Sequence, residues 1–338
     1  MKIAITSDPF IPVPPVNYGG IERIIDFLAE GLAKKGHEVV LVAHADSKVN
    51  VPLMKYPPLK EGIKGHLDNV LTINKLKDLK PDLIHSFSRL AYLLPFLGSD
   101  VPKLMSYQRE PTISQVRKAV KFSKKNTLAF TGCSNYISDQ IKPFASSFTV
   151  YNGVDLEKYK FQSAVEDDAP LVFLGRIEPV KGTHIAVEAS KATGKKLLIA
   201  GNIPSEHQPY FEEKIAPHLD EKIKYVGPVN DVQKNELLGK AAAFLMPIEW
   251  DEPFGIVMAE ALACGTPVIG YRRGAVPEVV EHGVNGFIAD SFNSLCSYIL
   301  KSASLSRRDA RKSAEENFSS KVIIDRYLDV YQSLINKN

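Results

Sequence analysis

The sequence predicts an α/β protein of two domains, each built on a parallel sheet with helices on both faces. Its 338 residues suit two domains of ordinary size. Short apolar runs alternate with amphipathic stretches of helical period along the chain. This rhythm stops at a polar stretch near residue 160 and then starts again. Repeated β–α units of this kind form parallel sheets that are covered by helices.

The first half opens with an apolar run at Lys2–Thr6, which turns polar too soon for a signal peptide and predicts a strand. A helix is expected over Ile21–Lys35, because its apolar residues recur on one face. Further strands are expected at Glu38–Ala43, Leu83–Phe87, Lys103–Tyr107 and Leu128–Cys133. We assign residues 1–158 to an N-terminal domain.

The rhythm restarts after the polar stretch Tyr159–Ala169, which we interpret as the linker. Strands are then expected at Leu171–Leu174, Leu197–Ala200, Lys224–Val226, Ala243–Met246 and Pro267–Ile269. The helices between them are expected over His184–Ala192, Val232–Lys240 and Ile256–Cys264. These elements define a C-terminal domain over residues 165–318. A last amphipathic helix is expected within residues 319–338.

Composition narrows the class of protein. With 44% hydrophobic and 24% charged residues, the chain is an ordinary globular protein rather than a disordered or coiled-coil one. No apolar run approaches the ~20 residues that a membrane-spanning helix needs. Three scattered cysteines without a CxxC pair indicate neither a zinc site nor a disulfide framework, so we expect a cytoplasmic protein without a bound metal.

Charge is unevenly spread between the two halves. Residues 1–160 hold 22 lysines and arginines against 15 acids, a net +7, and the remainder holds 20 against 24, a net −4. A basic and an acidic half indicate separate surfaces or partners. The excess is too small to predict a nucleic-acid partner, and none is expected.

Ligands of open α/β sheets bind at the carboxyl ends of the strands, so the residues there are the candidates. A long Pro-rich loop follows the first strand and ends in Gly19–Gly20 at a helix start, where backbone N–H groups can meet an anion. A plain turn that starts a helix explains these glycines equally well. His85 ends another strand and could meet substrate there, although a structural histidine is the alternative.

Two cations follow the first strand of the C-terminal domain. Gly175 and Arg176 end that strand, and Lys181 stands at the next helix start. Two fixed cations beside a helix N-terminus suit a diphosphate, and two surface cations are the alternative. The segment is not a Walker A loop, because Val180 stands where that loop needs its second glycine.

The most informative stretch runs from Met246 to Val268. Glu252 and Glu260 lie eight residues apart, which places both carboxylates near one face if Pro253 opens the helix. Glu260 stands among apolar residues and needs hydrogen-bond donors, such as sugar or ribose hydroxyls. The free N–H groups of a helix start can receive phosphate, and here they belong to Phe254, Gly255 and Ile256. The alternative is a capping glutamate with one buried salt bridge.

Together these residues resemble the family 4 retaining glycosyltransferases, also called group 1 glycosyl transferases, which have the GT-B fold. The paired glutamates with the trailing Ala-Cys-Gly-Thr-Pro-Val are similar to that family's most specific motif. The other matching segments are Gly19–Gly20, Asp82 with His85, Asn152-Gly153-Val154-Asp155, and Gly175-Arg176 with Lys181-Gly182. They are spread in order over most of the chain.

The resemblance implies a GT-B fold of two Rossmann-like domains across a cleft, with the last helix crossing back to the first. It implies a nucleotide-sugar donor, most simply a UDP- or GDP-sugar, and no cofactor. Arg176, Lys181, Glu252 and His85 would be catalytic. The donor would be held by Gly19, Gly20, Gly175, Phe254, Gly255, Ile256 and Glu260, with Glu260 on the ribose. The acceptor side would hold Tyr18, Arg109 and Asn152.

The resemblance further implies transfer with retention to a hydroxyl of a glycan, a lipid-linked glycan or a small glycoside, without a metal. The sequence has no Asp-x-Asp triplet for a metal-bound diphosphate. The chain is short for the family around Ser47–Gly65, which leaves the acceptor open. Trp250 could cover the sugar or serve as a structural residue.

The stretch Gln115–Lys125 holds five cations beside apolar residues. As a helix it could lie on the inner face of an anionic membrane near a lipid-linked acceptor, or it could be a solvated outer face. Three other functions stay open. They are a nucleotide-sugar epimerase or hydrolase of similar fold, an inactive sugar-nucleotide-binding partner protein, and a nicotinamide-dependent oxidoreductase. The last is disfavoured, because no G-x-G-x-x-G follows the first strand.

Overall fold

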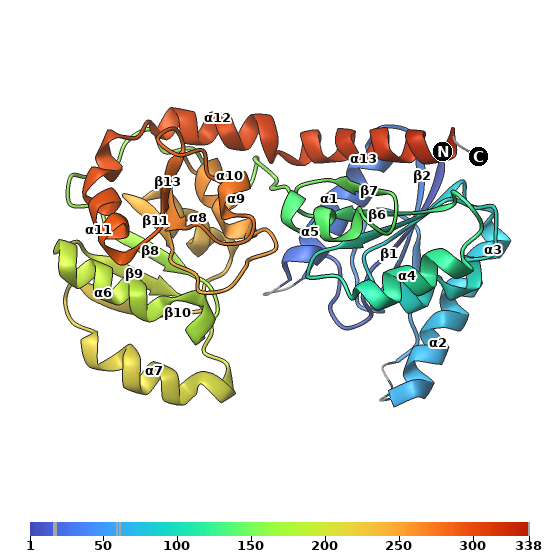
Figure 1. The fold of residues 1–338 in the computed structure, drawn as a ribbon, viewed down its shortest axis with the longest axis horizontal. Helices are drawn as coiled ribbons and strands as arrows, with labels where there is room; N and C mark the ends of the chain where they lie inside the picture. Colours follow the sequence, from blue (N-terminus) through green and yellow to red (C-terminus); the bar gives the residue numbers. More distant parts are fainter. Residues whose placement is uncertain (16–18, 59, 61, 337–338) are drawn as a thin grey trace. The chain divides into compact units, whose positions relative to one another are not determined.

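The computed structural model describes the chain except for residues 16–18, 59, 61 and 337–338 (Figure 1). It divides into two compact units. Unit 1 comprises Met1–Gly153 and Ser320–Asn338, and unit 2 comprises Val154–Ser319. The division falls before the polar stretch 159–169 that we expected as the linker, because Tyr159 is buried and its hydroxyl bonds to Glu260 within unit 2. No helix of the described residues is long and apolar enough to span a bilayer.

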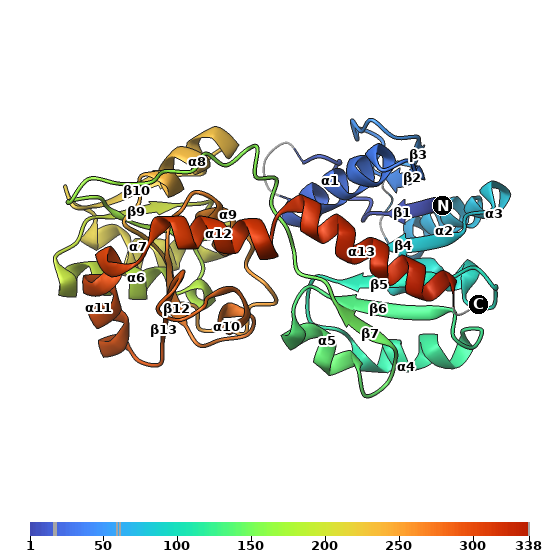
Figure 2. The same cartoon turned by 90° about the horizontal axis from the view of Figure 1, so that it is seen from above.

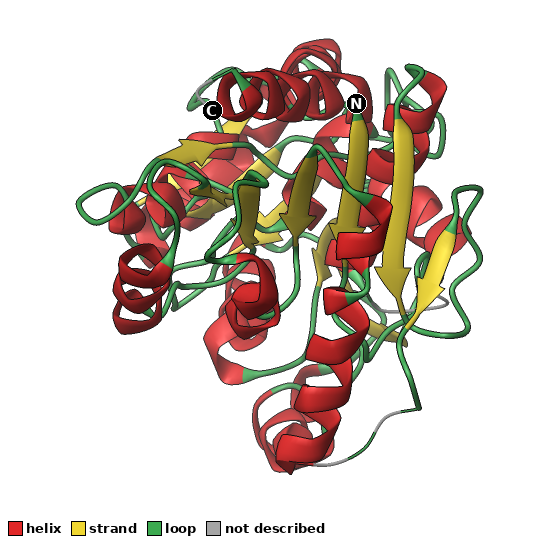
Figure 3. Ribbon diagram, turned by 90° about the vertical axis from the view of Figure 1, so that its right-hand side faces the viewer, coloured by secondary structure: helices red, strands yellow, loops and turns green. Residues whose placement is uncertain are grey.

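Unit 1 holds a seven-stranded parallel sheet in the order β3-β2-β1-β4-β5-β6-β7. Figure 3 shows the strands as yellow arrows between the helices. Its strands are β1 (Lys2–Thr6), β2 (Glu38–Ala43), β3 (Leu53–Lys55), β4 (Leu83–Ser86), β5 (Lys103–Tyr107), β6 (Leu128–Gly132) and β7 (Ser147–Thr149). Its helices are α1 (Gly20–Lys34), α2 (Gly62–Asn74), α3 (Leu76–Leu79), the 3₁₀ helix η1 (Leu90–Phe96), α4 (Ile113–Phe122), α5 (Asn135–Ile141) and α13 (Ser320–Ile335).

The helix at the end of the sequence completes unit 1. Helix α13 lies beside α1 on one face of the sheet, and α2 and α4 lie on the other (Figures 1 and 2). Its inner residues, among them Tyr327 and Tyr331, are buried at helical spacing. Asp325 bonds to Lys35 after α1 at 2.7 Å. Burial of one apolar face therefore joins the last helix to the first one.

His85 is part of this junction and does not reach a ligand edge, contrary to the expectation. It is completely buried between the sheet and α13. Its Nδ1 hydrogen-bonds to the Tyr331 hydroxyl at 2.6 Å, and its Nε2 bonds to the Ser106 hydroxyl at 2.6 Å. Side chains of a strand point alternately to the two faces of the sheet, and His85 points to the face that α13 covers. Burial lowers the pKa of His85 to about 3, so the ring is neutral.

Unit 2 holds a six-stranded parallel sheet in the order β10-β9-β8-β11-β12-β13. Its strands are β8 (Leu171–Leu174), β9 (Leu197–Ala200), β10 (Ile223–Gly227), β11 (Ala243–Met246), β12 (Val268–Tyr271) and β13 (Gly286–Ala289). Its helices are η2 (Pro179–Lys181), α6 (Thr183–Thr193), η3 (Ser205–His207), α7 (Gln208–Lys214), η4 (Ala216–His218), α8 (Asp231–Gly239), α9 (Ile256–Ala263), α10 (Val276–Val279), α11 (Phe292–Lys301), η5 (Ser302–Ser304) and α12 (Arg307–Asn317).

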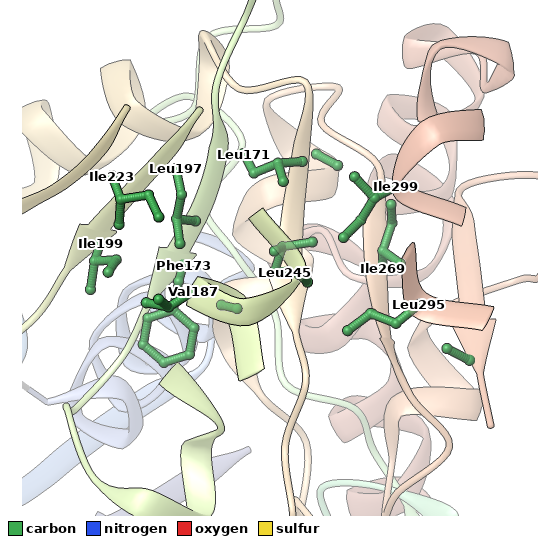
Figure 4. Close-up of a cluster of buried hydrophobic side chains, with 14 of the residues drawn as sticks. Leu171, Phe173, Val187, Leu197, Ile199, Ile223, Leu245, Ile269, Leu295 and Ile299 are labelled. Carbon is green, nitrogen blue, oxygen red and sulfur yellow. The ribbon is translucent and has the colours of Figure 1, made fainter. Parts of the chain in front are cut away.

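The core of unit 2 is a continuous apolar layer between the sheet and its helices. Figure 4 shows strand residues such as Phe173 and Leu245 together with Val187 of α6 and Ile299 of α11. Strands covered on both faces read as unbroken apolar runs, which is why their positions could be predicted. The short strands β3, β7 and β13 were missed. The basic helix was expected over Gln115–Lys125, but it spans Ile113–Phe122 and leaves the last two lysines outside.

A buried arginine holds several segments of unit 2 together. Arg307 donates to the carbonyl oxygens of Gln162, Ala241 and Gly239 at 2.7–2.8 Å. It also donates to the Thr266 hydroxyl at 2.8 Å. Burial lowers the pKa of Arg307 to about 10. The guanidinium thus joins three segments: the chain at Gln162, the end of α8, and the residues that follow α9.

We expect Arg307→Met to lower the unfolding free energy of unit 2 by about 2–4 kcal/mol, because it leaves several buried carbonyls without donors. Trp250 is the only tryptophan and lies in unit 2, so its fluorescence during urea unfolding measures this unit. The control is Arg308→Met, which changes an exposed neighbour. Equal midpoints for the two variants would contradict this role for Arg307.

We expect unit 1 to become less stable as the pH falls below about 6.5. In the unfolded chain His85 takes up a proton near 6.5, but in the folded chain only near 3, so between these values the unfolded state holds more protons. The loss should approach about 2 kcal/mol between about pH 7 and pH 5. Hydrogen exchange of β4 and α13 measures it. His85→Gln keeps a polar side chain that does not titrate and should flatten the dependence; an unchanged slope would refute the assignment.

Candidate functional site

The candidate site lies at the carboxyl edge of the unit 2 sheet, in the loops that follow β8 and β11. These strands are neighbours, so the two loops emerge side by side. Glu249 N donates to Val180 O at 2.9 Å and joins the loops. Gly182 has a φ of +72°, and a Cβ there would lie 1.9 Å from Pro247 O. Only glycine allows this approach of the two backbones.

This approach brings Lys181 against Glu252. Lys181 Nζ lies 2.6 Å from Glu252 Oε2, with side chains only 16% and 12% exposed. Trp250 Nε1 donates to the same oxygen at 3.1 Å. Lys181 Nζ also lies 4.6 Å from the centre of the Trp250 ring. Trp250 was expected either to cover the sugar or to serve as a structural residue. These contacts favour the structural interpretation, because they orient Glu252 and Lys181.

A third loop fixes the backbone around Glu252. Ala275 N donates to Glu252 O at 2.9 Å, and Gly274 N donates to Asp251 Oδ1 at 3.1 Å. Both donors lie in the turn that follows β12. Hydrogen bonds therefore fix both the side-chain carboxylate and the main-chain carbonyl of Glu252.

The start of α9 lies a few residues further on and differs from the expectation. The helix begins at Ile256 after the left-handed Gly255, and Pro253 does not open it. Glu252 is therefore outside the helix, and the two glutamates do not share a helical face. Phe254 is buried, with its ring 5.8 Å from that of Phe318. Gly255 and Ile256 are half-buried at the helix start, where backbone N–H groups lack acceptors within the helix.

Glu260 lies in the second turn of α9 and belongs to a second cluster. Its carboxylate is buried, as expected. Its Oε1 accepts from the Tyr159 hydroxyl at 2.5 Å and from Lys234 Nζ at 2.5 Å. Lys234 also lies 3.5 Å from Asp231. The donors that burial requires thus come from the protein itself, and a role for Glu260 toward ribose stays a prediction.

Arg176 lies in the same turn as Lys181 but pairs with a different acid. Its Nη2 lies 3.1 Å from Glu178 Oε1, and its side chain is half-exposed. Glu178 is buried and lies 3.8 Å from His207 Nε2. Gly175 N donates to Ala200 O at 3.1 Å, which fixes the turn to the neighbouring strand. The four charged residues that we assigned to the donor therefore form three separate ion pairs.

The glycine loop of unit 1 leads into α1, as expected. Gly20 is the first residue of the helix, and Tyr18 lies outside the described residues. Glu22 of the first turn is buried, and burial raises its pKa. A Cβ on Gly19 would lie 2.8 Å from Glu22 Oε2, so an acidic side chain already borders this helix start. Donor binding by these glycines stays a prediction.

The carboxyl edge of the unit 1 sheet holds Asp8 and Gln108, which the sequence analysis missed, as well as Arg109 and Asn152, which it expected on the acceptor side. Asp8 follows β1 and Gln108 follows β5. Within the described part of the chain, Asp8 Oδ1, Asn152 Oδ1 and both polar amide atoms of Gln108 are buried without a hydrogen-bond partner. The exposed Arg109 lies 3.9 Å from Asp8, and burial raises the pKa of Asp8 against the opposing charge of Arg109. These groups are suited to polar contacts with a ligand.

Sequence reasoning missed five residues of these clusters for different reasons. Glu178 stands inside the cation motif and could have been found there. Asp8 and Gln108 directly follow strands and could have been found by position. Lys234 and Tyr159 are distant in sequence from Glu260, and nothing local marks them. No group of three His, Cys, Asp or Glu residues arranged for a metal occurs among the described residues.

Two family models match consecutive parts of the chain. The model "Glycosyl transferases group 1" matches residues 155–317, which holds all the clusters of unit 2. The model "Glycosyltransferase Family 4" matches residues 18–158. The boundary between the matches agrees with the division into two units to within a few residues.

Curated relatives and solved structures are similar over nearly the whole chain. A putative glycosyltransferase YtcC of Bacillus subtilis is 26% identical over 99% of this chain and 93% of its own. The N-acetyl-alpha-D-glucosaminyl L-malate synthase of Bacillus anthracis is 24% identical over 99% and 97%. AviGT4, a glycosyltransferase of avilamycin A biosynthesis, matches with a TM-score of 0.74 at 24% identity over 100% and 98%.

HepE of Anabaena, in complex with UDP and glucose, matches with a TM-score of 0.76 at 20% identity over 98% of this chain and 100% of its own. These structural matches confirm the predicted fold class, two Rossmann-like parallel-sheet domains of the GT-B type. The family models, the relatives and the predicted motifs agree with one another. The chain belongs to the group 1 glycosyltransferases of family 4.

Proposed function

We propose that this glycosyltransferase moves a sugar from a UDP- or GDP-sugar to an acceptor hydroxyl with retention and without a metal ion. The contact of Lys181 with Glu252, four residues before the start of α9, carries this proposal. Two neighbouring loops of unit 2 thus contribute a cation and a carboxylate close to the backbone N–H groups of a helix start. A sugar diphosphate offers a partner to each of them.

The chemical step is a substitution at C1 of the donor sugar. The bond from C1 to the β-phosphate oxygen breaks, and its electron pair stays on the leaving diphosphate. Arg176, Lys181 and the N-terminus of α9 would stabilise this growing negative charge. The acceptor hydroxyl forms the new bond to C1 on the same face and gives its proton to the leaving phosphate. No protein nucleophile is required.

The two glutamates would act on different parts of the donor. Glu252 Oε2 already accepts from Lys181 and Trp250, so we assign Oε1 to a hydroxyl of the transferred sugar. Glu260 would accept from ribose hydroxyls beside Lys234 and Tyr159. A buried carboxylate that receives several donors keeps its charge and its position.

For the acceptor we propose contacts in unit 1. The unpartnered polar atoms of Asp8, Gln108 and Asn152 suit hydroxyl groups, and the exposed Arg109 suits an anionic substituent. His85 takes no part, because both ring nitrogens bond within the buried junction. A carbohydrate acceptor fits this set of donors and acceptors. Bound UDP in HepE, and ADP and acarbose in a plant starch synthase, support a nucleotide-sugar donor.

We expect Lys181→Ala and Glu252→Ala each to lower turnover by about 10²-fold or more, because each removes a fixed charge that faces the reacting groups. A thermal-shift screen of UDP-, GDP-, ADP- and dTDP-sugars identifies the donor for this assay. The controls Lys191→Ala and Glu188→Ala change exposed residues of α6. Near-normal turnover in both site variants would reject the site. Free sugar without a glycosylated product would identify a hydrolase instead.

We expect EDTA to leave turnover unchanged, because side-chain cations and helix N–H groups take the charge of the leaving diphosphate. The measurement is the initial rate after chelation and gel filtration, with and without added Mg²⁺ or Mn²⁺. Loss of activity that a divalent ion restores would contradict the metal-independent step. It would leave the assignment as a glycosyltransferase intact.

A further inference from the structure

Helix α2 of unit 1 turns an apolar stripe to solvent, while its buried residues include the polar Asn69 and Thr72 beside Ile73. Its outward residues Ile63, Leu67 and Leu71 recur every four positions and are 79%, 54% and 61% exposed. Its inward face buries Asn69, which donates to the Tyr92 hydroxyl at 3.0 Å. A surface helix normally turns its apolar stripe to the core. An outward apolar stripe of this kind indicates a partner.

The layer of helices that contains α2 continues this pattern. Helices α2 and α4 lie on the same face of the sheet (Figure 1), and η1 packs against both of them. Leu94 of η1 is 59% exposed, and Phe122 at the end of α4 is 68% exposed. Among the described residues of unit 1, this layer holds five of the six exposed large apolar side chains, the sixth being Phe10. We call α2, η1 and α4, with the residues up to Lys125, the basic layer.

The charge of the same layer is strongly positive. Residues 62–74, 90–96 and 113–125 contain six lysines and arginines and one acid, a net +5. This is most of the +7 excess of residues 1–160, so the rest of that half carries only +2. Asp68 is already paired with Lys60 at 2.7 Å. Lys118 and Lys121 are exposed on α4.

We propose that the basic layer binds the surface of an anionic lipid bilayer. Apolar side chains beside lysines enter the boundary between headgroups and acyl chains, while the ammonium groups meet the lipid phosphates. Each cation near such a surface adds attraction, and the net charge of the layer is complementary to it. This binding needs none of the residues assigned to sugar transfer, so it stands apart from the proposed function.

The test is co-sedimentation of the full chain with vesicles of phosphatidylglycerol and phosphatidylcholine, and with vesicles of phosphatidylcholine alone. We expect binding to the anionic vesicles that weakens as salt is added. Leu67→Ser with Leu71→Ser, and separately Lys118→Glu with Lys121→Glu, should each lower the partition coefficient about tenfold or more. These are exposed residues, so the variants should fold; the melting temperature checks this.

Matched controls lie outside the basic layer. Leu300→Ser changes a 60% exposed leucine of unit 2, and Lys34→Glu with Lys321→Glu reverses two exposed charges on α1 and α13. Both controls should bind like the unmodified chain. Absence of binding to anionic vesicles, equal binding to neutral ones, or equal loss in the controls would overturn the proposal. So would dimerisation that the Leu67→Ser, Leu71→Ser variant abolishes, because the stripe would then be a protein interface.

Discussion

The site of unit 2 depends on the close contact between the loops that follow β8 and β11. At this contact the missing side chain of Gly182 lets the carbonyl of Pro247 approach, and Lys181 then meets Glu252. A half-buried ion pair adds little net stability, because removing both charges from water offsets their attraction. Its effect is on geometry. It fixes the direction of a cation and a carboxylate before any substrate arrives, as a preorganised site requires.

Each cation of the site has its own acid. Lys181 pairs with Glu252, Arg176 with Glu178, and Lys234 with Glu260. Such pairing keeps several charges in a small volume without mutual repulsion among the cations. In the proposed function a diphosphate would compete with these carboxylates for the cations, while its sugar and ribose would offer hydroxyls to the carboxylates. A nucleotide sugar would then offer a partner to both members of the pairs, whereas inorganic phosphate has no sugar hydroxyls to offer the carboxylates.

Much of this could be predicted from local sequence. The central strands were found because apolar runs buried on both faces are visible without context, and the Glu252 segment because its motif is contiguous. Prediction failed where distant segments decide the outcome. His85 stands at a strand end like a ligand-binding residue, but α13 covers it with Tyr331, which lies 246 residues later in the sequence. A local error was the start of α9: the helix begins at Ile256 after the left-handed Gly255, and not at Pro253, so Glu252 and Glu260 do not share a helical face.

The position of α13 also determines the order in which the two units can fold during synthesis. Unit 2 is one unbroken segment, and it interrupts unit 1 between Gly153 and Ser320. During synthesis the ribosome therefore delivers all of unit 2 before the helix that carries Tyr331 and closes over His85. Unit 2 can fold as it emerges, whereas in nascent unit 1 the part of the sheet face beside α1 stays uncovered until the last helix leaves the exit tunnel. For that interval the apolar surface that α13 will cover, including the surroundings of His85, stays exposed to water.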